Sequence, residues 1–158
     1  MAVRLAIVVS DFNEKITSKM LETAMEHAIK LKAKVSFVMH VPGAFDMPIA
    51  VEALLKKKQI DAVVTLGAVI KGDTKHDEIV AENAARLIAD LSLKYGKPVS
   101  LGITGPGMTA AQARDRAVAV PVRAIRAAVS MALRLGKLEK TAAATTPVIL
   151  RDDSAYNN

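Results

Sequence analysis

The chain has 158 residues, of which 51% are hydrophobic, 24% are charged and 3% are aromatic, and its formal net charge is +6. This length predicts one compact domain with a real core, and the ordinary charged fraction excludes intrinsic disorder over most of the chain. No apolar run approaches the roughly 20 residues of a membrane helix, and the first residues lack a signal-peptide pattern. The absence of cysteine excludes disulfides, thiolate nucleophiles, zinc ribbons and iron–sulfur clusters. We therefore expect a soluble, cytoplasmic protein.

Hydrophobic periodicity predicts an alternation of strands and helices, because short runs rich in β-branched residues are typical of buried parallel strands. In chain order we expect a strand at 4–10, a helix at 16–31, a strand at 35–41, a helix at 47–58, a strand at 62–70, a helix at 76–94, a strand at 98–104 and helices at 109–117 and 122–138.

Strands that alternate with helices form βαβ units, in which a parallel sheet is covered on both faces. The predicted fold class is therefore α/β: a three-layer α/β/α sandwich with a four-stranded parallel, flavodoxin-like sheet. We expect residues 1–140 to form this single domain and residues 141–158 to form a C-terminal tail or arm.

Aromatic side chains are so scarce that each can be named: Phe12, Phe37, Phe45, Tyr95 and Tyr156. The core is therefore expected to be aliphatic. A phenylalanine outside an apolar run then needs its own explanation.

Positive charge is unevenly placed along the chain. Residues 1–111 carry 14 Lys or Arg and 12 Asp or Glu, whereas residues 112–140 carry 7 and 2. This basic excess fits either a solvated helix face or a surface for nucleic acid or an anionic small molecule.

Ligands of open α/β sheets bind beyond the carboxyl ends of the strands. The segments that follow the predicted strand ends are residues 11–13, 42–46, 71–76 and 105–109. They are rich in glycine and polar residues, and two of the three phenylalanines, Phe12 and Phe45, lie in them. The Phe12 ring either folds over the edge of the core or offers a stacking surface to a planar ligand.

The segment Gly-Asp-Thr-Lys-His, residues 72–76, joins the most apolar strand to the longest helix. Two interpretations are open: Asp73 or Thr74 caps that helix, or the helix N-terminus binds an anion, usually phosphate. The segment is not a Walker loop, since no GxxxxGK[ST] string occurs in the chain.

Histidine is the side chain best suited to proton transfer near pH 7. His76 lies at a strand end, where ligands bind, whereas His27 is expected on or half below a helix surface and His40 within the core. Arg114 and Arg116 are either solvated or able to clamp a phosphate bidentately. No pair of residues has metal-ligand spacing, so no metal is predicted.

Five strings occur in order between about residue 4 and residue 116: DFNxxIT, VPGAFDMP, LGAVIKGDTKHDEIV, KPVSLGITGPGMT and QARDRA. Together they resemble the 6,7-dimethyl-8-ribityllumazine synthase family, and the DMP, GDTKHDEIV and GPGMT variants look like its archaeal branch. The resemblance implies a transferase without a cofactor, at the penultimate step of riboflavin biosynthesis. Such an enzyme condenses 5-amino-6-(D-ribitylamino)uracil with 3,4-dihydroxy-2-butanone 4-phosphate and releases phosphate and water.

The resemblance also implies a role for each matched position. His76 would transfer protons, and Phe12 would stack on the pyrimidine ring. The ribitylaminouracil would be bound by Phe12, Ala44, Phe45, Asp46, Ala68, Val69, Ile70 and Leu101. The butanone phosphate would be bound by Asp73, Thr74 and Arg116. Leu101 and Arg116 would reach the pocket from the neighbouring subunit.

The partners implied by the resemblance are two small-molecule substrates and further copies of the chain. Family members form pentamers with active sites between subunits, and many form a 60-subunit shell of twelve pentamers. Neither a nucleic acid nor a membrane is implied, and the chain has no basic patch interleaved with aromatic residues.

One departure from the family pattern lies before the last helix. Many bacterial members carry an Asn-Lys-Gly segment whose lysine faces the phosphate, and here that stretch reads VAVPVRA. Val120 stands at about the lysine position, Pro121 is expected to interrupt any helix, and Arg123 is a candidate substitute. The alternative function is therefore a weakly active or inactive member that binds a ligand or forms a cage.

Overall fold

The computed structural model describes residues 2–142 and 145–151. Its elements in chain order are β1 (Arg4–Ser10), α1 (Glu14–Lys30), β2 (Lys34–Val41), the 3-10 helix η1 (Ala44–Asp46), α2 (Met47–Leu55), β3 (Ala62–Ile70), α3 (His76–Tyr95), β4 (Val99–Met108), α4 (Ala110–Asp115) and α5 (Ala119–Glu139). None of the described helices is long and apolar enough to cross a membrane.

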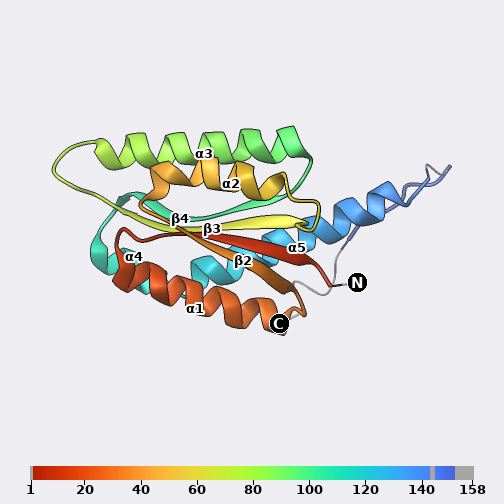
Figure 1. The fold of residues 1–158 in the computed structure, drawn as a ribbon, viewed down its shortest axis with the longest axis horizontal. Helices are drawn as coiled ribbons and strands as arrows, with labels where there is room; N and C mark the ends of the chain where they lie inside the picture. Colours follow the sequence, from red (N-terminus) through yellow and green to blue (C-terminus); the bar gives the residue numbers. More distant parts are fainter. Residues whose placement is uncertain (1, 143–144, 152–158) are drawn as a thin grey trace.

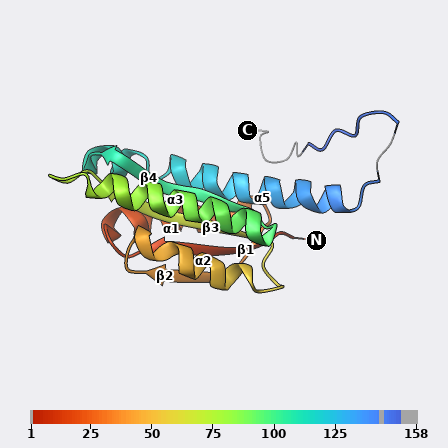
Figure 2. The same ribbon diagram turned by 90° about the horizontal axis from the view of Figure 1, so that it is seen from above.

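The four strands form one parallel sheet in the order β2-β1-β3-β4 (Figure 1). Helices α1 and α5 pack against each other on one face of the sheet, and α2 and α3 do so on the other face (Figures 1 and 2). This arrangement confirms the predicted α/β/α sandwich with a flavodoxin-like sheet. The strand order reverses at β1, which has β2 on one side and β3 on the other.

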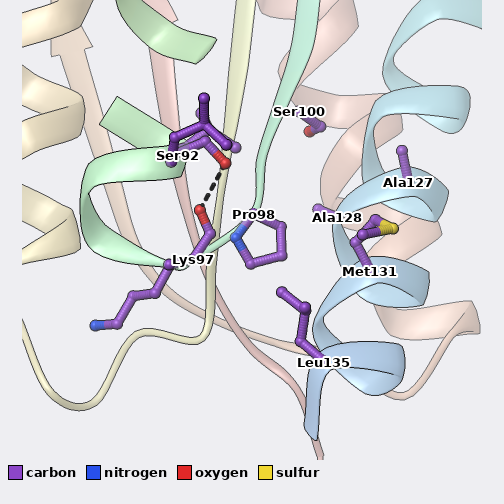
Figure 3. A pocket seen from close by; sticks show the side chains of 11 residues that line it. Ser92, Lys97, Pro98, Ser100, Ala127, Ala128, Met131 and Leu135 are labelled. Atoms are coloured by element: carbon purple, nitrogen blue, oxygen red, sulfur yellow. Dashed lines mark hydrogen bonds between the residues drawn. The ribbon is translucent and has the colours of Figure 1, made fainter. Parts of the chain in front are cut away.

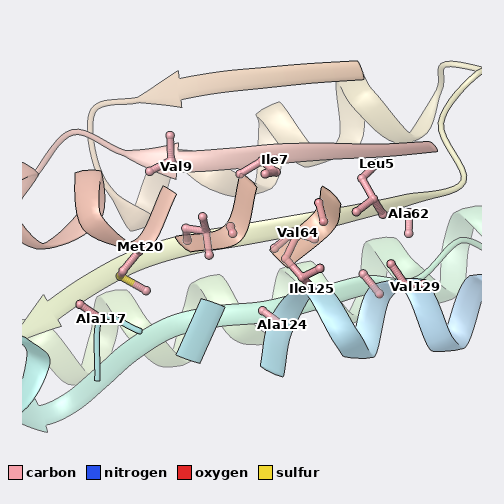
Figure 4. Packing of buried hydrophobic residues seen from close by; sticks show 14 of the residues in the cluster. Leu5, Ile7, Val9, Met20, Ala62, Val64, Ala117, Ala124, Ile125 and Val129 are labelled. Atoms are coloured by element: carbon pink, nitrogen blue, oxygen red, sulfur yellow. The ribbon is translucent and has the colours of Figure 1, made fainter. Parts of the chain in front are cut away.

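The core is aliphatic, as predicted, and the sheet divides it into two clusters. Ile7 of β1 and Ile125 of α5 belong to the cluster under α1 and α5 (Figure 4). Val8, the next residue of β1, points to the opposite face and belongs to the cluster under α2 and α3. Phe37 and Tyr95 pack against that second cluster from partly buried positions. Because β1 and β3 are covered on both faces, they read as nearly continuous apolar runs, broken within β3 only by Thr65 and Gly67.

The close approach of β4 to β3 requires a residue without a side chain at position 102. A Cβ atom at Gly102 would collide with the carbonyl oxygen of Thr65 and lie 3.2 Å from the Cβ of Ala124. A glycine here lets β4 lie against β3 and leaves room for α5 above the sheet.

Strand β4 is longer than predicted, because it runs to Met108 instead of ending at residue 104. Gly105 and Gly107 have φ values of 99° and 73°, which favour glycine, and they carry the strand through an irregularity. Met108 then pairs again with Ile70 of β3. The prediction of a loop over 105–109 is therefore wrong except at Thr109.

Helix α5 begins at Ala119, so the predicted interruption at Pro121 is also wrong. Proline lies in the first turn, where backbone N–H groups have no partner within the helix, and its missing N–H costs nothing there. Beyond α5, residues 145–151 contain no helix or strand, and the Lys137 Nζ donates to the Arg151 carbonyl at 3.0 Å. The rest of the predicted tail, 143–144 and 152–158, lies outside the described residues.

A histidine links the two helices on one face of the sheet. His27 of α1 is buried, not on or half below the surface as expected, and its Nε2 accepts a hydrogen bond from the Nε of Arg126 at 3.1 Å. That nitrogen can accept only when the imidazole is neutral. Burial, and then the positive charges of Arg126 and Lys30, lower the pKa of His27 below its ordinary value of 6.5.

The His27 contact predicts a pH-dependent stability. Because the unfolded chain binds a proton at His27 that the folded chain resists, the free energy of unfolding should fall as the pH drops below about 6.5. We expect His27→Gln, which keeps an acceptor for Arg126, to lose this part of the pH dependence. Urea unfolding of both proteins at one concentration, between about pH 8 and pH 5.5, measures the difference. Parallel curves would contradict the prediction.

Candidate active site

A cavity of about 460 Å³ opens at the carboxyl ends of β1 and β3 and runs to the start of α3. It lies where the strand order reverses, which is the place where open α/β sheets bind ligands. The lining residues are Ser10, Phe12, Gly43, Ala44, Phe45, Ala68, Val69, Ile70, Gly72, Thr74, His76, Asp77 and Val80. Eight of the twelve predicted site residues are among them.

Two aromatic rings border this cavity. Phe12 is 71% exposed and Phe45 is 60% exposed, although the protein has few rings and an aliphatic core. The Phe12 ring is therefore not folded over the edge of the core. Exposed rings beside a cavity can stack on a flat ligand through dispersion and π contact.

Asn13 fixes the segment that carries Phe12. Its backbone is left-handed, with φ 62°, and its carbonyl accepts hydrogen bonds from the N–H groups of Ile16 and Thr17 in the first turn of α1. Its side-chain Nδ2 donates to the carbonyl of Ala68 at 2.7 Å, which ties the end of β1 to β3 across the reversal point. Sequence reasoning missed this residue, although asparagine is one of the few residues that adopt the left-handed region readily.

The end of β3 supplies backbone groups and small apolar surfaces. Ala68 is 4% exposed and Val69 is 9% exposed, so the cavity floor is formed by a buried strand. Ala44, at the start of η1, is also buried and lines the same cavity. These side chains are small and apolar, which suits contact with a planar ring.

The loop from 71 to 76 forms the other end of the cavity, and all six of its residues are exposed. Helix α3 has Lys75 at its N-cap and no side-chain cap hydrogen bond, so capping by Asp73 or Thr74 is not observed. The Thr74 Oγ1 accepts only a long hydrogen bond, 3.4 Å, from the backbone N–H of His76. An uncapped N-terminus of a 20-residue helix, next to an exposed hydroxyl, can receive an anion.

His76 is exposed at the first position of α3 and lines the cavity beside Thr74. An exposed imidazole can exchange protons with both a substrate and water. Asp77, the next residue, is only 6% exposed, and its Oδ2 accepts a hydrogen bond from the N–H of Gly107 at 2.8 Å. Sequence reasoning also missed Asp77.

Four predicted site residues lie outside the lining of this cavity: Asp46, Asp73, Leu101 and Arg116. The Asp46 Oδ2 accepts a hydrogen bond from the backbone N–H of Gly43 at 3.0 Å, and Asp73 is exposed in the loop. Leu101 is 53% exposed on β4. Arg116 follows α4, is exposed, and its Nη1 donates to the Gln112 carbonyl at 3.5 Å. Among the residues that the structure describes, none that lines this cavity is a Lys or Arg.

A second cavity, of about 370 Å³, lies between the end of α3, the start of β4 and α5 (Figure 3). Met131 and Leu135 of α5 face Pro98 there, and the Ser92 Oγ donates to the Lys97 carbonyl at 2.9 Å. None of the predicted site residues lines it. It therefore has no part in the candidate active site.

The remaining histidine does not form a metal site. His40, expected in the core, is exposed, and its Nδ1 lies 2.7 Å from the Oδ1 of Asp11. Within 2–142 and 145–151, no group of three or more His, Cys, Asp or Glu side chains is placed to hold a metal ion.

Comparisons with known proteins agree on one family. The sequence model of 6,7-dimethyl-8-ribityllumazine synthase matches residues 2–136. A protein of that name from Methanococcus maripaludis is 56% identical over 137 residues, which cover 87% of this chain and 99% of the relative. The one from Methanocaldococcus jannaschii is 56% identical over 138 residues, with 87% and 97% covered. The one from Saccharolobus islandicus is 51% identical over 149 residues, with 94% and 97% covered. These relatives are archaeal, which confirms the predicted branch.

The Asn13 bridge predicts a stability difference between two substitutions. Asn13→Gly keeps the left-handed backbone and removes only the hydrogen bond to Ala68, so we expect a loss of about 0.5–1.5 kcal/mol. Asn13→Ala also strains the backbone and should cost about 1–2 kcal/mol more. Urea unfolding measures both, and equal losses would show that the left-handed conformation is not retained.

Proposed function

Because the chain belongs to the 6,7-dimethyl-8-ribityllumazine synthase family, we propose that it condenses 5-amino-6-(D-ribitylamino)uracil with 3,4-dihydroxy-2-butanone 4-phosphate. The observation that carries this proposal is the cavity at the reversal point of the sheet. There an exposed ring, Phe12, lines the same cavity as the end of β3, and His76 begins a helix whose N-terminus has no side-chain cap.

In the proposed complex the two substrates occupy opposite ends of this cavity. The uracil stacks on Phe12 and meets the backbone edge of residues 68–70, while the ribityl chain lies along 44–46, where Asp46 can accept hydroxyl protons. The butanone phosphate lies at the start of α3, against the backbone N–H groups of Asp73 and Thr74 and the Thr74 hydroxyl. Holding both reactants in one pocket supplies most of the acceleration, because it converts an encounter in solution into a reaction between neighbours.

The chemistry needs proton transfers and a good site for the leaving group. The 5-amino nitrogen attacks the ketone carbon, and loss of water forms an imine. Removal of a proton from the next carbon then expels phosphate, and the resulting enol becomes a ketone. The ribitylamino nitrogen attacks this ketone, and loss of a second water closes the ring. His76 is proposed to accept and return the protons in these steps.

We also propose that the active site is completed by a second copy of the chain, in a pentamer. A departing phosphate needs a cation, and no Lys or Arg is among the described residues that line the cavity of one chain. Arg116 and Leu101 are exposed but lie outside that lining, which is consistent with their acting in the pocket of a neighbour. A shell of twelve such pentamers is the larger assembly that this proposal allows.

Product formation from the two named substrates, followed by absorbance, tests the proposed reaction. We expect turnover above the uncatalysed rate, and we expect His76→Ala to lower kcat by up to about 100-fold, the lower end for a general acid–base group. The modest size follows because His76→Ala leaves the positioning of the substrates intact. Absence of turnover by the unaltered protein would contradict the enzyme hypothesis and favour the ligand-binding or cage-forming alternative.

Arg116→Ala tests the proposed phosphate clamp separately. A charge-assisted hydrogen bond contributes about 1.5–3 kcal/mol, so we expect KM for the butanone phosphate to rise about 10- to 100-fold. KM for the ribitylaminouracil should change little. Arg114→Ala, two residues away on α4, is the matched control and should leave both constants unchanged. If Arg116→Ala also leaves them unchanged, the clamp assignment is wrong.

A further inference from the structure

Asp77 is a buried acid for which the proposed reaction has no use. It is the second residue of α3 and is 6% exposed, and no other Asp or Glu in the described part of the chain is buried. Acidic side chains are almost never buried without a partner. The contacts of the Asp77 carboxylate should therefore explain why it is buried.

The partner of Asp77 is a backbone amide. Its Oδ2 accepts a hydrogen bond from the N–H of Gly107 at 2.8 Å, and across 2–142 and 145–151 it takes part in no ion pair within 4.0 Å. Gly107 has φ 73° and lies in the irregular last part of β4. The hydrogen bond thus joins the first turn of α3 to the end of a strand 30 residues further along the chain.

A second hydrogen bond anchors the other end of the 71–76 loop to Met108, the residue after Gly107. The N–H of Lys71 donates to the carbonyl of Met108 at 2.8 Å. The exposed residues 72–76 are therefore bracketed by two contacts, both of which end on the pair 107–108. Residues 72–76 have no buried side chain of their own to fix their position.

We propose that Asp77 is a positioning residue, which holds the 72–76 loop in place for the phosphate of the substrate through the amide of Gly107. This inference rests on the proposed function. Asp77 is not itself a phosphate ligand, because a carboxylate repels a phosphate and this one is committed to an N–H group. Its effect is to fix where Thr74 and the first N–H groups of α3 stand relative to the cavity.

Three variants test this proposal: Asp77→Ala, which removes the acceptor; Asp77→Asn, which keeps an acceptor oxygen without the charge; and Glu82→Ala. Glu82 is an exposed acid five residues further along α3 and serves as the matched control. Hydrogen exchange, read by mass spectrometry on peptides that contain 71–76, reports the loop directly. KM for the butanone phosphate and for the ribitylaminouracil is measured on the same preparations.

We expect Asp77→Ala to raise loop exchange about 10- to 100-fold, as loss of a hydrogen bond to a charged group predicts, while exchange in α5 stays the same. KM for the butanone phosphate should rise about 10-fold and KM for the ribitylaminouracil should stay within about twofold. Asp77→Asn should recover most of both losses, and Glu82→Ala should match the unaltered protein.

Three results would overturn the proposal: loop exchange and KM unchanged in Asp77→Ala, equal rises in KM for both substrates, or no recovery in Asp77→Asn. If Asp77→Ala does not fold, Asp77→Asn is compared with Glu82→Ala instead. The positioning role requires near-normal loop exchange and near-normal KM in both variants, and altered values in Asp77→Asn would overturn it. Failure of the proposed function is recognised separately, because the unaltered protein would then show no turnover while its loop exchange remains measurable.

Discussion

The burial of β1 and β3 on both faces is the constraint on which the rest of the structure depends. A parallel sheet made of aliphatic strands must be covered by helices on each side, and here α1 and α5 cover one face while α2 and α3 cover the other. Polar chemistry is thereby excluded from the faces of the sheet and confined to the carboxyl ends of its strands. The cavity at the reversal point is where that edge is left open.

The site that forms at this edge is held together by backbone partners. Asn13 donates to the carbonyl of Ala68, and Asp77 accepts from the N–H of Gly107. Each contact joins segments that are far apart in the chain, the first across β1 and β3 and the second across α3 and β4. The segment that carries Phe12 and the start of α3 are therefore each tied to another strand by one side chain, Asn13 in the first case and Asp77 in the second.

This division explains what could be read from the sequence. Strands β1 and β3 match their predicted bounds because burial on both faces requires a nearly continuous apolar run. Phe12, Thr74 and His76 could be expected at the cavity because they come after strand ends, and all three line it. Asn13 and Asp77 could not, because a partner that is a backbone group leaves no residue pattern. The extension of β4 to Met108 escaped prediction since glycine and proline there resemble a loop.

Positive charge for a phosphate is scarce in the cavity at this end of the sheet within one chain. Val120, at about the position of the bacterial lysine, is partly buried and packs against the cluster under α1 and α5. The first turn of α5 thus presents an apolar side chain to the core and gives the cavity no cation. The partial positive charge at the start of α3 is available within one chain, and full charge must come from residues outside the cavity lining.

Arg116 comes directly after α4, and α4 is the element that follows β4. The end of β4 makes the contacts that anchor the 72–76 loop, so the loop anchor and the proposed clamp lie on one short segment of the chain. If that clamp serves a neighbouring pocket, the position of the loop in one site and of the arginine in the next are set by the same short segment.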